Sequence, residues 1–371
     1  MAMNLRLSPD LIDKDLSLAE TLPAKFYRDE AFIEMAKDAI FTRSWQFITD
    51  SDSLAVPGKV IPATILPGYL DEPIIISRDN DDKLQCLSNV CTHRGNLLVE
   101  GECHAQTLRC RYHGRRFSLN GEMLSTPGFE KAPCFPRENG KDNLSKVHFG
   151  QWDKFLFAAI HPGYEFAELI APMKERLSWM PFDKFIFDPT RSQDYLVKAN
   201  WALYVENYLE GFHIPYVHPA LAQALDCKDY NTEIHRYSNL QIGIAASPAD
   251  AFEDIPKDSA DYGKNVAAYY FWLFPNMMFN FYPWGISINV ITPLAKDRTR
   301  VSYITYLYDE KKLNQGAGAN VDKTEREDQS IIEQVQKGMN SRFYSRGRYS
   351  PDWEKGPHHF HSLLTEFLSA D

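Results

Sequence analysis

Two short segments, 91–95 and 110–114, each combine a cysteine with a histidine and end in a glycine. The first reads Cys-Thr-His-Arg-Gly and the second reads Cys-Arg-Tyr-His-Gly, so each offers one thiolate and one imidazole donor. Glycine tolerates the backbone conformations of tight turns, and we therefore expect two loops whose tips meet. Such a donor set can bind zinc as a Cys2His2 site, or a [2Fe–2S] cluster in which histidines replace cysteines on one iron.

The order of the donors along the chain separates these two alternatives. Finger-type zinc sites group their cysteines in one pair and their histidines in another. Here each segment supplies one of each, with sixteen residues between His93 and Cys110. This order favours a cluster of the Rieske type, bound by Cys91, His93, Cys110 and His113. The remaining cysteines, at positions 86, 103, 134 and 227, are interpreted as buried free thiols.

A second pair of histidines, His213 and His218, lies five positions apart with Pro215 between them. Proline disrupts a helix, and a break at this point can turn both imidazoles toward one place. Taken alone, such a pair is a weak signal. A cluster that delivers single electrons needs an acceptor, however, and two histidines with one carboxylate bind Fe(II) with positions left open for dioxygen.

Both motifs resemble those of the α subunits of Rieske non-haem iron oxygenases, the aromatic-ring-hydroxylating oxygenase family. The resemblance includes the Arg-Gly that follows His93 and the glycine that follows the second cluster histidine. It implies that Asp328, in the segment 324–330, is the third iron ligand. Glu325 and Glu327 are nearby alternatives, which we otherwise expect on a solvated helix start.

The same resemblance assigns a catalytic role to Glu210, three residues before His213. Many ring-hydroxylating members carry aspartate at this place. The residue is then not a ligand but a bridge, which hydrogen-bonds a histidine at the iron and a cluster histidine, His113, of a neighbouring subunit. A carboxylate in such a position orients an imidazole and assists electron passage.

An oxidoreductase is implied, the terminal oxygenase component of a multicomponent system. It would use O2, and electrons from NAD(P)H through a separate flavin- or ferredoxin-type reductase, to hydroxylate a small organic substrate. A quaternary ammonium or N-methylated substrate would then undergo N-dealkylation. The alternatives are ring hydroxylation of an aromatic compound, by mono- or dioxygenation, and a Rieske electron carrier without oxygenase activity. The resemblance also implies a homotrimer.

Residues 265–295 contain no charged side chain and many aromatic ones. The segment is long enough to cross a bilayer, but prolines, asparagines and a glycine interrupt it, so we expect buried strands joined by turns. By resemblance this sheet lines the substrate pocket, with a few aromatics of 269–284 facing it. The glutamate at 210, the chain length and the segment 274–278 look more like choline, glycine betaine and carnitine oxygenases than naphthalene dioxygenase.

The elements that must position these residues follow from hydrophobic periodicity. We expect an N-terminal helical segment at 1–44 that packs on the catalytic domain, an all-β domain with the cluster at 45–161, and a larger catalytic domain at 162–371. The fold class is α+β, and the resemblance implies a curved antiparallel sheet of the helix-grip, START-like type. Helices are expected near 29–41, 201–212 and 322–342. The histidines at 358, 359 and 361 are interpreted as surface residues.

The amino-acid composition excludes several classes of protein and partner. The 371 residues are 44% hydrophobic and 24% charged, which is typical of globular proteins and excludes a disordered or fibrous chain. The net charge of -10, without a long basic run, argues against nucleic acid as a partner. Residues 1–20 contain no apolar signal segment, so we expect a soluble cytoplasmic protein without a membrane partner.

Overall fold

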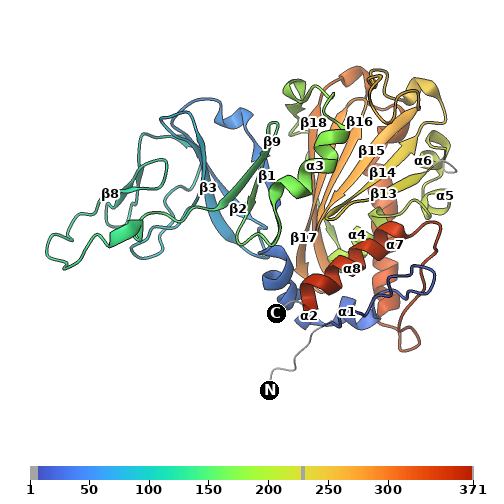
Figure 1. Ribbon diagram of the computed structural model, residues 1–371, viewed down its shortest axis with the longest axis horizontal. Coiled ribbons are helices and arrows are strands. Elements are labelled where there is room, and N and C mark those ends of the chain that lie inside the picture. Colours follow the sequence, from blue (N-terminus) through green and yellow to red (C-terminus); the bar gives the residue numbers. More distant parts are fainter. Residues whose placement is uncertain (1–6, 227–229, 370–371) are drawn as a thin grey trace. The chain divides into compact units, whose positions relative to one another are not determined.

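The protein is described here by a computed structural model, which covers residues 7–226 and 230–369. The chain divides into two compact units. Thr42–Gly163 forms the smaller one, and Met1–Phe41 together with Tyr164–Asp371 forms the larger one. Each unit has its own sheets and its own buried core, and Figure 1 shows both.

The smaller unit is built from short antiparallel strands, which confirms the all-β character predicted for this part of the chain. Its three sheets have the strand orders β1-β10-β9, β4-β3-β2-β5 and β6-β7-β8. The strands are β1 (Gln46–Asp50), β2 (Lys59–Ile65), β3 (Glu72–Arg78), β4 (Leu84–Ser88), β5 (Cys103–His104), β6 (Leu108–Arg109), β7 (Arg116–Phe117), β8 (Met123–Ser125), β9 (His148–Trp152) and β10 (Phe155–Ala159).

The larger unit centres on an antiparallel eight-stranded sheet. Seven strands follow the order β11-β18-β17-β16-β15-β14-β13, and β12 also pairs with β18. The strands are β11 (Ile186–Phe187), β12 (Gln193–Val197), β13 (Asn231–Ile234), β14 (Ser238–Ile244), β15 (Val266–Leu273), β16 (Met277–Tyr282), β17 (Gly285–Ala295) and β18 (Arg298–Leu307). The uncharged segment thus forms three neighbouring buried strands, as predicted, and no helix in the described residues is long and apolar enough to span a membrane.

In the larger unit α4 contacts α7, α8 and β17, and these three helices lie together beside the sheet, whereas α3 lies apart from them (Figure 1). The helices of the larger unit are α1 (Ala24–Arg28), α2 (Glu30–Ala36), which continues into a π-helical turn at Lys37–Phe41, α3 (Phe166–Arg176), α4 (Trp201–Tyr208), α5 (Ile214–Val217), α6 (Pro219–Ala224), α7 (Val321–Met339) and α8 (Lys355–Ser369). The predicted helices at 29–41 and 322–342 match α2 and α7, whereas α4 ends four residues before the predicted 212.

The C-terminal helix α8 corrects the interpretation of the histidines at 358–361. The ring of His361 is buried, with Nδ1 2.5 Å from the hydroxyl of Tyr349, and His359 Nδ1 lies 2.8 Å from Asn239 Oδ1. These two side chains are therefore not free surface groups. The apolar positions of α8 recur at helical spacing and are buried, which draws the histidines between them inward: Phe360, Leu363, Leu364 and Phe367.

Candidate metal centres

The path of the chain after α4 positions two histidines of the larger unit, His213 and His218. Asn200 begins α4 by accepting a hydrogen bond from Ala202 N at 3.0 Å. The chain leaves the helix after Tyr208 and makes the single helical turn α5 between His213 and His218. Pro215 lies in the first turn of α5, where its missing N–H is not needed, so it starts a helix rather than breaking one. The prediction of a break at the proline is wrong in this detail.

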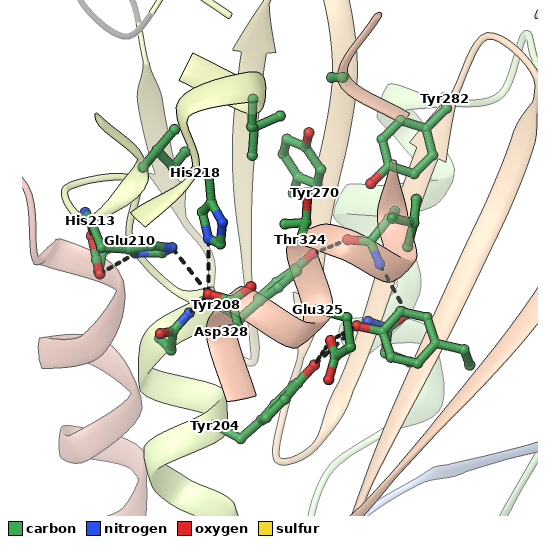
Figure 2. A pocket seen from close by; sticks show the side chains of 18 of the residues that line it. Tyr204, Tyr208, Glu210, His213, His218, Tyr270, Tyr282, Thr324, Glu325 and Asp328 are labelled. Carbon is green, nitrogen blue, oxygen red and sulfur yellow. Dashed lines mark hydrogen bonds and ion pairs between the residues drawn. The ribbon is translucent and has the colours of Figure 1, made fainter. Parts of the chain in front are cut away.

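His213 and His218 flank this turn and face one another, with ring centroids 5.1 Å apart. Asp328 reaches them from α7: its Oδ1 lies 3.0 Å from Nε2 of His218 and 3.5 Å from Nε2 of His213 (Figure 2). One ligand atom from each of the three residues lies within 4.8 Å of the others. Two imidazoles and a carboxylate that converge in this way fit a mononuclear Fe(II).

Each of these histidines turns its other nitrogen to a glutamate. His213 Nδ1 lies 2.6 Å from Glu210 Oε1, and His218 Nδ1 lies 2.8 Å from Glu327 Oε2. A carboxylate on Nδ1 holds the proton there, so that Nε2 keeps its lone pair for a metal. Burial alone lowers the pKa of His218, but hydrogen bonds to Asp328 and Glu327 outweigh burial and raise it.

Glu327 is a residue that sequence reasoning missed, because it was set aside as a group on a solvated helix start. Its contact with His218 depends on the rotation of α7 about its axis, which the local sequence does not reveal. The same expectation is wrong for Glu325, whose side chain is buried on α7. The carboxylate of Asp328 also accepts from Asn207 Nδ2 at 2.7 Å, a second contact that the spacing of the motifs did not indicate.

The loop that carries Glu210 is held from several directions. Glu210 Oε2 accepts hydrogen bonds from the backbone N–H groups of Phe212 and His213, the latter at 3.1 Å. A Cβ on Gly356, at the start of α8, would lie 2.2 Å from the carbonyl oxygen of Leu209. Only glycine permits this close approach, and it fixes the chain immediately before Glu210.

In the smaller unit the two cysteine–histidine loops have the same backbone geometry. Gly95 N donates to Cys91 O at 3.1 Å, and Gly114 N donates to Cys110 O at 3.0 Å. Both glycines have left-handed backbones, with φ of 71° and 75°. The expectation that each glycine permits a tight turn is therefore confirmed, and the two cysteines occupy equivalent places in their loops.

The four donor side chains of these loops lie together. The thiols of Cys91 and Cys110 are buried, and burial first, then the neighbouring Cys110 thiol, raise the pKa of Cys91. The imidazoles of His93 and His113 have ring centroids 4.6 Å apart, and His113 is exposed. Two buried sulfurs and two accessible ring nitrogens fit a [2Fe–2S] cluster with histidines on its outer iron.

The other cysteines only partly follow the prediction of buried free thiols. Cys86 is buried and free, whereas Cys103 and Cys134 are free but exposed. They lie in parts of the smaller unit outside its buried core, which explains the difference. Cys227 lies outside the described residues.

A cavity of about 110 Å³ adjoins the histidine–aspartate triad (Figure 2). Its walls come from α4 to α6, the strands β15 to β18 and α7. Tyrosine rings make up much of the lining: Tyr204, Tyr208, Tyr230, Tyr270, Tyr282 and Tyr303. Of the aromatics in 269–284, Tyr270 and Tyr282 thus face the cavity, and the described lining residues include the carboxylates Glu210, Glu325 and Asp328 but no lysine or arginine.

Comparison with known proteins identifies two domains in this chain. Residues 187–370 match the family model of the ring hydroxylating alpha subunit (catalytic domain), and residues 44–136 match the Rieske [2Fe-2S] domain. The chloroplastic choline monooxygenase of Beta vulgaris is 26% identical over 363 residues, which cover 94% of this chain and 77% of the relative. The carnitine monooxygenase oxygenase subunit of Escherichia coli (strain K12) is 28% identical over 382 residues, covering 97% of this chain and 98% of the relative.

Solved structures share the fold. A quaternary ammonium Rieske monooxygenase, studied for carnitine oxidation and inter-subunit electron transfer, superposes with a TM-score of 0.78 at 24% identity, over 98% of this chain and 99% of its own. Naphthalene 1,2-dioxygenase superposes with a TM-score of 0.73 at 17% identity. The predicted α+β class, an all-β Rieske domain with a mixed catalytic domain, is confirmed. The chain is a Rieske oxygenase α subunit and belongs to the Rieske non-haem iron oxygenase family, with greater similarity to choline and carnitine monooxygenases than to naphthalene dioxygenase.

Proposed function

We propose that this oxygenase hydroxylates a carbon of a cationic, quaternary or N-methylated amine. The observation that carries the proposal is the tyrosine-lined cavity beside the histidine–aspartate triad, without lysine or arginine among its described lining residues. Aromatic faces attract a quaternary ammonium through their quadrupoles, and the neighbouring carboxylates favour a positive charge. The names of the choline and carnitine relatives support the same class of substrate.

In this proposal His213, His218 and Asp328 hold the mononuclear Fe(II), and Cys91, His93, Cys110 and His113 hold the [2Fe–2S] cluster. When bound, these groups supply dioxygen activation and single-electron transfer. The chain itself supplies the position of the substrate and the orientation of the ligands. Glu210 and Glu327 fix the two imidazole rings, and Asn207 fixes the carboxylate of Asp328.

The overall reaction converts a C–H bond to C–OH. One atom of O2 enters the product and the other leaves as water, with two electrons and two protons consumed. Where the carbon is bonded to nitrogen, the resulting hemiaminal loses its hydroxyl proton and its C–N bond breaks, which gives an amine and an aldehyde. This is the N-dealkylation expected for an N-methyl group.

Electron delivery involves other chains in this proposal. A flavin- or ferredoxin-type reductase would pass electrons from NAD(P)H, and a homotrimer would bring the cluster of one subunit to the iron of the next. The contact of Glu210 with His213 and the exposed side chain of the nearby Phe212 support a bridging role for Glu210. In that bridge it would meet His113 of the partner subunit. Free thiols in the described smaller unit are compatible with a reducing cytoplasm.

The experiment uses protein reconstituted with iron and sulfide, reduced, and supplied with 18O2. We expect 18O in the product of a quaternary ammonium probe such as choline, or in the aldehyde released by dealkylation. Oxygen incorporation into naphthalene or another arene, with none into cationic amines, would replace this proposal with ring hydroxylation. A sample that shows the cluster spectrum but oxidises neither class would indicate an electron carrier.

A further inference from the structure

The buried carboxylate of Glu325 is not used by the mechanism above. It lies on α7 three residues before Asp328, lines the cavity and is only 2% exposed. Its Oε2 accepts hydrogen bonds from the hydroxyls of Tyr204 (Figure 2) and Tyr303. Its Oε1 accepts from Gln329 Nε2 at 3.0 Å. All three donors are neutral side chains.

Charge balance sets Glu325 apart from the other two carboxylates of the cavity. A bound Fe(II) would carry two positive charges beside Asp328, and the carboxylates of Glu210 and Glu327 hydrogen-bond the two histidines at that site. The side-chain hydrogen bonds of Glu325 come from the three neutral donors, and among the described residues no lysine, arginine or histidine forms an ion pair with it. Burial raises the pKa of Glu325, with Asp328 adding to the rise. A buried carboxylate is costly unless a cation pairs with it.

We infer that Glu325 is the specificity-determining counter-ion for the substrate, which is a cation without a carboxylate of its own. This inference rests on the proposed function and narrows it. A positively charged substrate in the cavity would supply the counter-charge that the Glu325 carboxylate otherwise lacks. A zwitterion such as L-carnitine would bring its own carboxylate close to those of Glu210, Glu325 and Asp328, which would repel it. The described lining residues include no lysine or arginine that could pair with it.

The test is calorimetric binding to the iron- and cluster-loaded protein, with three probes. Choline carries the cation, 3,3-dimethylbutan-1-ol has the same shape without the charge, and L-carnitine adds a carboxylate. We expect choline to bind about tenfold or more tightly than either of the others, the scale of one charge pair in a partly buried site. Equal binding of choline and the neutral alcohol, or tight binding of L-carnitine, overturns the inference without any variant.

Two variants on α7 then separate charge from hydrogen bonding. Glu325→Gln keeps the shape and removes the charge, and we expect it to lose most of the preference for choline over the neutral alcohol. Gln329→Met removes a neutral donor to Glu325, keeps the charge, and retains the preference for choline. An unchanged preference in Glu325→Gln would refute the role of Glu325, even while 18O incorporation continued. If the parent protein incorporated no 18O into the product but still preferred choline in binding, the proposed function would be refuted instead.

Discussion

Replacing Glu327 by glutamine tests how the iron site is held, because only one atom of the Glu327–His218 contact changes its chemistry. Glu327 Oε2 accepts from His218 Nδ1 at 2.8 Å, and the His218 side chain is 1% exposed against 27% for Glu327. Loss of such an outer carboxylate lowers metal affinity by about 10- to 100-fold, or roughly 1.4–2.7 kcal/mol. The partial exposure of Glu327 places the expected effect near the lower end, about tenfold.

The assay is competition for Fe(II) against a calibrated chelator, in anaerobic protein with an intact cluster. Glu333→Gln is the matched control, since Glu333 lies on the same helix and accepts only from the backbone N–H of Lys198 in the contacts described, at 3.0 Å. Its iron affinity should equal that of the parent. If Glu327→Gln also binds iron like the parent, the orientation of His218 does not depend on this carboxylate and the reasoning is refuted.

Three further predictions concern His213 in the larger unit, and Gly114 and the free cysteines in the smaller unit. His213→Ala should abolish product formation while the visible spectrum of the cluster is unchanged; turnover at the parent rate would remove His213 from the site. Gly114→Ala should destabilise the smaller unit by about 1–2 kcal/mol, because φ is 75° there, and a thermal melt with no shift would contradict this. Burial raises the pKa of Cys86 to about 12, so at pH 8 iodoacetamide should label the exposed Cys103 and spare Cys86. Mass spectrometry that finds both thiols labelled at equal rates in folded protein would show that Cys86 is not protected.

The pKa of Cys86 also predicts the direction of a pH effect on stability. The folded thiol stays protonated above pH 9, whereas the unfolded thiol ionises there. The unfolded state therefore binds fewer protons, and the free energy of unfolding should fall as the pH rises through 9. Chemical denaturation of Cys86→Ser should show a smaller decline over the same range, and an identical decline would contradict the assignment.

Local motifs predicted which side chains lie together where the donor residues are close in sequence. The loops at 91–95 and 110–114 carry their ligands and their turn glycines together, so the pattern predicted the convergence that the structure contains. The pair His213 and His218 is also close in sequence, and the centroids of its two rings lie 5.1 Å apart, as the motif predicted. Asp328 is more than a hundred positions away, and only the family resemblance connected it to them.

What the sequence did not predict depends on contacts between distant elements. The rotation of α7 about its axis brings Glu327 into contact with His218. The same rotation buries Glu325 against tyrosines from α4 and β18. A stretch of charged residues gives no sign of which side chain faces inward. Helix α8 was missed because its histidines suggested a polar terminus, although its apolar residues recur at helical spacing.

The most direct test of the account is the metal content of reconstituted protein and of the variant Asp328→Ala. The parent should contain about three irons and two acid-labile sulfides per chain, the content of one [2Fe–2S] cluster and one mononuclear site. The variant should lose one iron and keep the sulfide and the visible bands of the cluster. An unchanged iron count in Asp328→Ala, or a colourless parent protein loaded with zinc, would contradict the account.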